Sequence, residues 1–245
     1  MTTRTDAADV LVGRVRCALP WGLALSMVLS AALDAQQPLP TTVRAWHGSW
    51  FDTEVTREKP VAIDVHYTVT AVRRADGQVF VRGANGKEWC FVPPLPPGVR
   101  YVDVSLGELC VALRSDGQIV QWGLQAAATR RPLPVPGNPW VAVEAGGAFA
   151  FALRADGTVD AWGNNAGGQC NVPVLATGLQ YVDLAGGDSH GAGLVSDGTL
   201  RAWGLNMFGQ TNVPPLPSGR VATRIAGGTW HTLALLDDGN VLAWG

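Results

Sequence analysis

Apolar and polar residues alternate in short runs along much of the chain, and the clearest example lies between residues 181 and 217. Two apolar runs, Tyr181–Ala185 and His190–Ser196, are followed by an Asp-Gly pair and a third run, Thr199–Trp203. Alternation with period two is typical of strands, and Asp-Gly between such runs favours a tight hairpin because both central residues can adopt positive φ. A fourth short strand is expected at Gln210–Val213, before prolines that cannot continue a ladder.

The same phrase recurs every 40 or 41 residues, each time as an Asp-Gly pair followed by an apolar run that ends in Trp-Gly or, once, Arg-Gly. The five copies run over residues 76–83, 116–123, 156–163, 197–204 and 238–245. A repeat of this length is one supersecondary unit that cannot bury its own apolar face, so copies must stack. Four strands in about 40 residues is the size of a β-propeller blade. The sequence therefore predicts an all-β propeller or partial propeller of four-stranded blades, with helix confined to the first residues.

Tryptophan closes the return strand in most copies, and this position is expected to pack between blades. A buried indole removes roughly 150 to 250 Å² from water, which is worth about 4 to 6 kcal/mol before entropy is subtracted. Residues 43–46 repeat the return strand once more, so six such strands bracket five complete intervals. The tryptophans assigned to packing are Trp46, Trp122, Trp162, Trp203 and Trp244.

The order Gly-Gly-x-x-His, Ala-Leu, Asp-Gly, Val-x-Ala-Trp-Gly-x-Asn, Gly-Gln and Val-Pro carries a family resemblance. The segments GGTWHTLALLDDGNVLAWG and WGLNMFGQTNVPP resemble the regulator of chromosome condensation repeat family, especially its bacterial secreted members. The resemblance covers about residues 43–245 and implies a propeller, in that family typically of seven blades. Five intervals fall two short, so residues 36–245 are expected to form an incomplete or shortened ring. The family is dominated by interaction proteins, which implies a protein-binding role.

The first 35 residues lie outside the repeat and resemble an export signal. Arg14 and Arg16 precede an uncharged stretch from Cys17 to Leu33, and small residues suit cleavage after Ala32 or Ala35. A retained membrane anchor is the alternative, but 17 uncharged residues that include a proline fall short of the ~20 that a spanning helix needs. Residues 1–35 are therefore predicted to be a signal peptide, and the mature chain is predicted to be secreted, periplasmic or on the cell surface, without a membrane span.

Charge and composition exclude one class of partner. The 245 residues are 47% hydrophobic with a net charge of −2, which allows a sizeable core in one repeat array. Lys59 and Lys87 are the only lysines, so the basic stripe that nucleic acid demands is missing. The cysteines after the leader are odd in number and are read as small residues of the fold, neither disulfide partners nor metal ligands; they are Cys90, Cys110 and Cys170.

No constellation of residues predicts catalysis. His190 and His231 share one repeat position that Phe149, Leu109 and Val69 also fill, so a packing role is expected there. No His-x-x-x-His or Cys-x-x-Cys spacing indicates zinc. The repeated aspartates sit in hairpins, where aspartate supports the turn. The chain is therefore predicted to be no enzyme and to need no cofactor or metal.

The candidate binding residues are aromatics in loops. Antiparallel strands alternate direction, so the loops after the first and third strands of each repeat emerge on one face. Five aromatics in such loops occupy positions that hold unlike residues in other repeats and so have no packing duty: Trp50, Phe51, Trp89, Phe208 and Trp230. Aromatics are enriched in interface hot spots. A secreted non-catalytic module for a protein partner is the leading hypothesis; the alternatives are a carbohydrate or cell-wall binder and a propeller enzyme of lyase or sialidase type.

Overall fold

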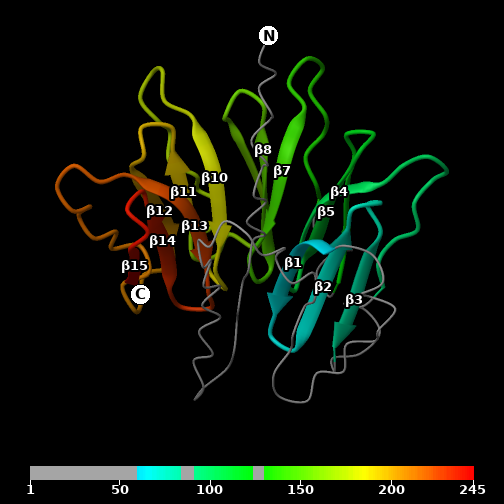
Figure 1. The fold of residues 1–245 in the computed structure, drawn as a ribbon, viewed down its shortest axis with the longest axis horizontal. Coiled ribbons are helices and arrows are strands. Elements are labelled where there is room, and N and C mark those ends of the chain that lie inside the picture. Colours follow the sequence, from blue (N-terminus) through cyan, green and yellow to red (C-terminus); the bar gives the residue numbers. More distant parts are fainter. Residues whose placement is uncertain (1–59, 84–90, 124–129) are drawn as a thin grey trace, which may run out of the picture.

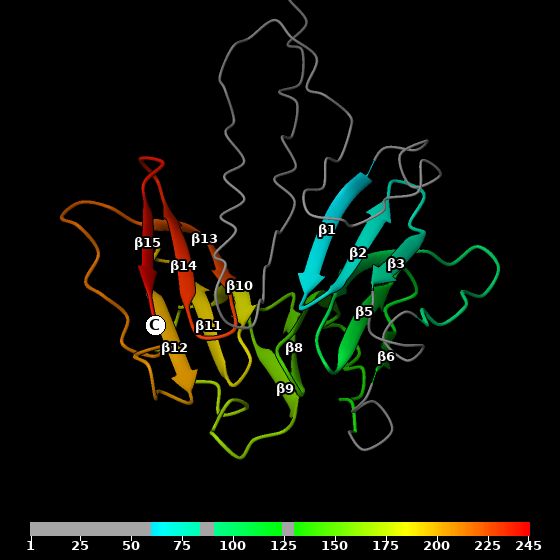
Figure 2. The same ribbon diagram turned by 90° about the horizontal axis from the view of Figure 1, so that it is seen from below.

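A computed structural model describes residues 60–83, 91–123 and 130–245, and these residues form five antiparallel sheets arranged side by side around an axis (Figures 1 and 2). Every sheet contains three strands that follow one another in the chain. The strands are β1 Pro60–His66, β2 Val69–Arg74, β3 Val79–Gly83, β4 Tyr101–Ser105, β5 Cys110–Arg114, β6 Ile119–Trp122, β7 Trp140–Ala145, β8 Phe149–Arg154, β9 Val159–Gly163, β10 Tyr181–Gly186, β11 His190–Val195, β12 Leu200–Gly204, β13 Ala222–Gly227, β14 Thr232–Leu236 and β15 Val241–Trp244.

The predicted fourth strand is not formed at residues 210–213. Gln210 and Thr211 lie in a turn, closed by a hydrogen bond from the Asn212 N–H to the Gly209 carbonyl (2.9 Å), and the backbone then runs into the proline-rich connection. The Gln210 side chain is fully buried and its Oε1 accepts the Phe208 N–H, while the Gln210 backbone carbonyl accepts the Trp244 indole N–H. The expectation of a fourth strand was wrong here because this segment, like the equivalent one in the preceding repeat, forms a loop held by a glutamine side chain.

The Asp-Gly hairpins form as expected, with a different turn. In the third sheet the Arg154 N–H bonds the Thr158 carbonyl and the Gly157 N–H bonds the Arg154 carbonyl, which leaves three residues in the loop. Gly157 has φ +78°, whereas no aspartate among the described residues has positive φ. This is the three-residue hairpin loop with glycine in the left-handed position. In every copy the aspartate Oδ1 accepts the N–H two residues on, which confirms its turn role.

The core consists of the spaces between successive sheets. Phe149, Phe151 and Leu153 of β8 pack against Tyr181 and Trp203 of the next sheet. Ala192 and Leu194 of β11 pack in turn against the sheet that follows. The predicted packing role of the described tryptophans is confirmed, since Trp122, Trp162, Trp203 and Trp244 are all buried; Trp46 lies outside the described residues.

Side-chain acceptors on the first strands connect one sheet to the next. The Asp103 carboxylate accepts the N–H of Val104 in its own strand through Oδ1 and that of Val143 in the next sheet through Oδ2. The acceptors that bond the following sheet are Asp64 to Leu106, Asp103 to Val143, Ser105 to Ala145, Glu144 to Gly186 and Asp183 to Ile225. Neighbouring sheets share no backbone ladder, so these side-chain bonds join one sheet to the next together with single backbone bonds, such as that from the Gly147 N–H to the Gly187 carbonyl (3.1 Å).

Glycines at the axial end of the first strands allow the sheets to converge. A Cβ atom on Gly107 would lie 2.0 Å from the Gly146 carbonyl oxygen, and one on Gly227 would lie 2.3 Å from the Gly186 carbonyl oxygen. Any side chain here would collide with backbone of the neighbouring sheet. The repeated glycines therefore fix how closely the sheets approach the axis.

Candidate functional site

The loop after β12 is braced by the same side chains as the loop after β9. Asn206 donates from Nδ2 to Asn212 Oδ1 (2.9 Å) and accepts the Thr211 N–H at its own Oδ1. Asn165 makes the equivalent bonds to Asn171 and to the Cys170 N–H in the preceding repeat. The glutamine brace described above is repeated as well, since Gln169 Oε1 accepts the Gly167 N–H. The two loops therefore share one hydrogen-bond frame.

Two apolar side chains project from the later loop, and neither side chain takes part in its hydrogen bonds. Met207 and Phe208 stand where the earlier loop has Ala166 and Gly167, and they are 73% and 58% exposed. Folding normally buries large apolar side chains because their burial is favourable, so folding does not explain why these two side chains are exposed. Because the same loop closes with Ala-Gly, the fold does not need them.

Trp230 lies beside them, in the loop between β13 and β14. It is 40% exposed, and its ring centroid is 5.3 Å from that of Phe208 at an interplanar angle of 63°, an edge-to-face contact. Ser189 and Ala148 fill the same position in the preceding sheets. We call Met207, Phe208 and Trp230 the aromatic patch. The structure thus brings together two of the five predicted site residues; Trp50, Phe51 and Trp89 lie outside the described residues, and the binding role of all five remains a prediction.

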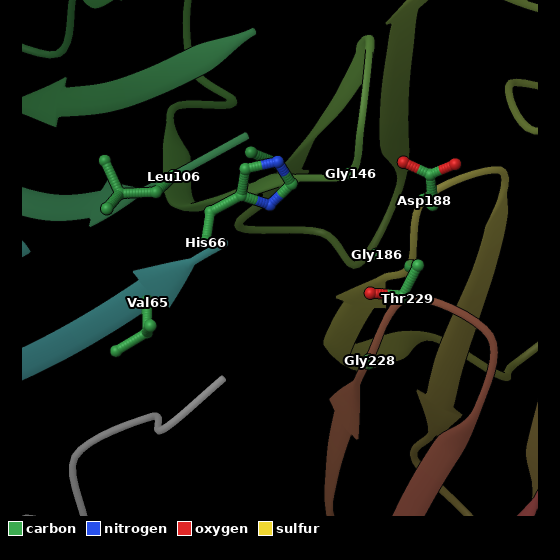
Figure 3. A pocket seen from close by; sticks show the side chains of 11 residues that line it. Val65, His66, Leu106, Gly146, Gly186, Asp188, Gly228 and Thr229 are labelled. Atoms are coloured by element: carbon green, nitrogen blue, oxygen red, sulfur yellow. The ribbon is translucent and has the colours of Figure 1, made fainter. Parts of the chain in front are cut away.

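A small cavity at the axis was not foreseen from the sequence. It measures about 20 Å³, room for about one water molecule, and the side chains of His66, Asp188 and Thr229 surround it together with glycine backbone (Figure 3). Tyr67, at φ +49°, donates from its hydroxyl to Asp188 Oδ1 (3.2 Å) and so links the first sheet to the fourth. Burial and the Asp188 carboxylate raise the pKa of Tyr67 to about 12. The cavity is too small for an organic substrate.

The histidine position is structural in the sheets that are followed by another sheet. His190 is 1% exposed and its Nε2 lies 2.9 Å from the Thr232 hydroxyl of the next sheet. Burial, with a smaller contribution from His231, lowers the pKa of His190 to about 4, so the ring is neutral at pH 7. Phe149, Leu109 and Val69 are buried at the same position. His231 is exposed, because no described sheet follows it.

The other candidate reactive groups are the described cysteines and the side chains that could bind a metal ion. Cys110 is buried and Cys170 partly buried, and both are free thiols. Burial raises the pKa of the Cys170 thiol to about 11, which disfavours the reactive thiolate. Among the described residues, no group of three or more His, Cys, Asp or Glu side chains is placed to hold a metal ion. No helix in this part of the chain is long and apolar enough to cross a membrane.

The family model for the regulator of chromosome condensation (RCC1) repeat matches the chain three times, at residues 140–169, 181–210 and 222–245. These segments correspond to the third, fourth and fifth sheets, where the sequence signature is most regular. No curated protein matches the chain in sequence.

Solved structures show the same fold at low sequence identity. Prp20p from Saccharomyces cerevisiae has 23% identity and a TM-score of 0.63, covering 78% of this chain and 58% of its own. The ectodomain of the Physcomitrella patens receptor kinase CR4 has 22% identity and a TM-score of 0.62, covering 77% of this chain and 53% of its own. Human WBSCR16 has 20% identity and a TM-score of 0.63, covering 76% of this chain and 62% of its own. The chain spans little more than half the length of these proteins. The prediction of an all-β propeller architecture is confirmed.

Proposed function

Because the chain carries regulator of chromosome condensation repeats folded as an array of propeller sheets, we propose that it is a non-catalytic module that binds a protein through the aromatic patch. The observation that carries the proposal is the comparison of two loops. They share one frame of asparagine and glutamine hydrogen bonds, yet only the later one displays Met207 and Phe208. Exposed aromatics with no packing duty are the residues expected in an interface hot spot.

Proteins of similar fold support a protein partner. One yeast structure is of Kap60 bound to RCC1 (Prp20), and the Prp20p structure was described with binding properties to Gsp1p and histones. His66 and Cys110 are buried, and the pKa values of His190 and Cys170 are shifted in the direction that disfavours their charged forms. These properties favour a binding role over a catalytic one. Arg14, Arg16 and the uncharged stretch after them support export, so we propose that the partner is met outside the cytoplasm.

A loop exchange tests the proposal. The double variant Met207→Ala, Phe208→Gly gives the later loop the residues of the earlier one, and Trp230→Ser introduces the residue of the fourth sheet. We expect each of Phe208→Ala and Trp230→Ala to weaken partner binding by about 1 to 3 kcal/mol with little loss of stability. Val174→Ala is the matched control, because Val174 is 98% exposed in the connection between the third and fourth sheets, outside the aromatic patch.

The partner is first identified by photo-crosslinking from position 207, with position 166 of the equivalent loop as the control site. Binding of the purified partner is then measured for all variants, and the same proteins are applied to a glycan array. Equal losses from Val174→Ala and the patch variants would contradict the assignment of the face. Patch-dependent binding to glycans without any protein partner would replace the proposal with a carbohydrate-binding role.

A further inference from the structure

Equivalent positions of the five sheets form a ring at one end of the axis, just after the first strand of each sheet. They are Tyr67, Gly107, Gly147, Asp188 and Thr229. Neighbouring members are in contact, since a Cβ atom on Gly147 would lie 2.8 Å from Asp188 Oδ1. Tyr67 bonds Asp188 from the first sheet to the fourth. The polar side chains of this ring therefore meet at the small cavity described above, which we call the axial cavity.

Thr229 brings a buried hydroxyl group to the axial cavity. The residue is 8% exposed, and no described residue forms a hydrogen bond with its Oγ1. The hydroxyl points into the cavity, on the same side as the Asp188 carboxylate and opposite the His66 ring (Figure 3). Buried polar groups in folded proteins almost always have a hydrogen-bond partner. The cavity therefore suits a polar ligand.

Two carboxylates at this end of the axis lack a positive counterpart. Asp188 accepts the hydroxyls of Tyr67 and, at 3.5 Å, of Ser189, but it forms no ion pair with a described residue. Burial, with a smaller contribution from Asp188, raises the pKa of Glu108 in the loop between β4 and β5. The loops described at this end of the sheets contain no lysine or arginine. The mouth of the cavity therefore favours a cation.

The size and lining of the axial cavity select the kind of cation. An ammonium group is about as large as a water molecule, which is what the cavity accommodates, and it donates three hydrogen bonds. The acceptors are the Asp188 carboxylate, the Thr229 hydroxyl and the glycine backbone that forms the rest of the wall. The planar guanidinium group of arginine is larger and does not fit. Asp188 and Tyr67 are partly exposed, so the cavity lies directly below the surface.

We propose that the axial cavity binds the ammonium group of a lysine side chain of the protein partner, while apolar side chains of the same partner contact the aromatic patch. Trp230 follows Thr229 in the chain, so the two sites are neighbours on one face. The long flexible stem of lysine can place its charge below the surface while the rest of the partner stays outside. The role of the partner rests on the proposed function, whereas the ammonium site is testable without any partner.

Butylammonium, which has the head group and stem of lysine, is the probe. Titration of the isotope-labelled protein, followed by NMR, should shift the amide signals of Asp188 and Thr229 with a dissociation constant on the order of 1 to 10 mM. Butylguanidinium has the same charge and butanol the same stem. Both should bind about tenfold more weakly or not at all, because the first is too large and the second is uncharged.

Three variants locate the site. Asp188→Asn removes the charge but keeps an acceptor for the Tyr67 hydroxyl, and it should weaken butylammonium binding about tenfold. Thr229→Val removes the hydroxyl at nearly constant shape and should weaken binding several-fold. Asp197→Asn is the matched control, since it makes the same change of charge at the other end of β11 and should leave binding unchanged. Asp188→Asn should also weaken binding of the partner and reduce its dependence on salt.

Several results would overturn the lysine site. They are the absence of a saturable shift with butylammonium, equal affinity for butylguanidinium, equal losses in Asp188→Asn and Asp197→Asn, tighter binding of Ca²⁺ than of butylammonium, and partner binding that Asp188→Asn leaves unchanged. Phe208→Ala should leave butylammonium binding intact, because Phe208 does not line the cavity. Failure of the aromatic patch and failure of the lysine site are therefore distinguishable.

Discussion

Replacing Gly107 by alanine tests whether close approach of backbones at the axis holds the array together. Gly107 does not have positive φ, so alanine is not excluded by its own backbone conformation. Its Cβ would lie 2.0 Å from the Gly146 carbonyl oxygen and 3.0 Å from that of Gly147. Both atoms belong to the main chain of the next sheet, so neither can move aside by changing a rotamer. The first and second sheets would have to shift relative to the third.

The expected loss combines two opposing effects. Overpacking in a dense interior costs about 1 to 3 kcal/mol, and a clash with backbone lies at the upper end or beyond. Alanine also restricts the unfolded chain, which returns about 0.4 to 1 kcal/mol. We therefore expect Gly107→Ala to lower the free energy of unfolding by about 2 kcal/mol, measured by urea denaturation followed by tryptophan fluorescence.

Gly167→Ala is the matched control, because the equivalent position in the next repeat already carries Phe208 and the nearest atom to the new Cβ would be the Gln169 side-chain oxygen at 3.2 Å. It should change stability by less than about 0.5 kcal/mol. If Gly107→Ala were as stable as the wild type, or if both variants lost the same amount, steric convergence would not be the reason for glycine at the axis.

Two further predictions concern buried polar groups. His190→Phe should fold, since Phe149 fills the same position, and should remove part of the acid sensitivity. Because the pKa of His190 is lowered to about 4 in the folded protein, the stability that the neutral ring contributes above pH 6.5 is lost as the pH falls toward 4, by roughly 3 kcal/mol. Urea denaturation across this pH range should show a smaller loss of unfolding free energy in the variant than in the wild type. The two carboxylate oxygens of Asp64 accept the N–H groups of Val65 and Leu106, and Asp64→Asn replaces one of these acceptors by an amide donor. The substitution should lower the free energy of unfolding by about 1 to 3 kcal/mol at pH 7. An unchanged unfolding curve would show that this bond between sheets adds no stability.

The repeat phrase predicted the architecture because its strongest signals are local. In the fourth sheet, alternation placed each of the three strands within one residue of its observed bounds, and the Asp-Gly pairs located the hairpin between the second and third strands of every sheet. Local signals did not identify the turn type, since Asp-Gly suits both a two-residue loop and a three-residue loop that ends in left-handed glycine. The Gln210 segment misled for a similar reason: a short run before proline looks like a strand, although the buried amide of Gln210 braces a loop.

What sequence reasoning missed depends on contacts about 40 residues apart. The following glycine identifies the hairpin aspartates, but nothing in the run Tyr101–Ser105 indicates that Asp103 bridges two sheets. The comparison that finds it is between repeats: the first strands carry acidic or hydroxyl residues at matching positions in an otherwise apolar run, and the last sheet carries Arg224 instead. The same comparison singles out Met207, Phe208 and Trp230. In a repeat array, the positions shared by all copies indicate how the sheets are held together. A residue that differs from its equivalents is not needed for that packing, so such differences indicate candidate binding positions.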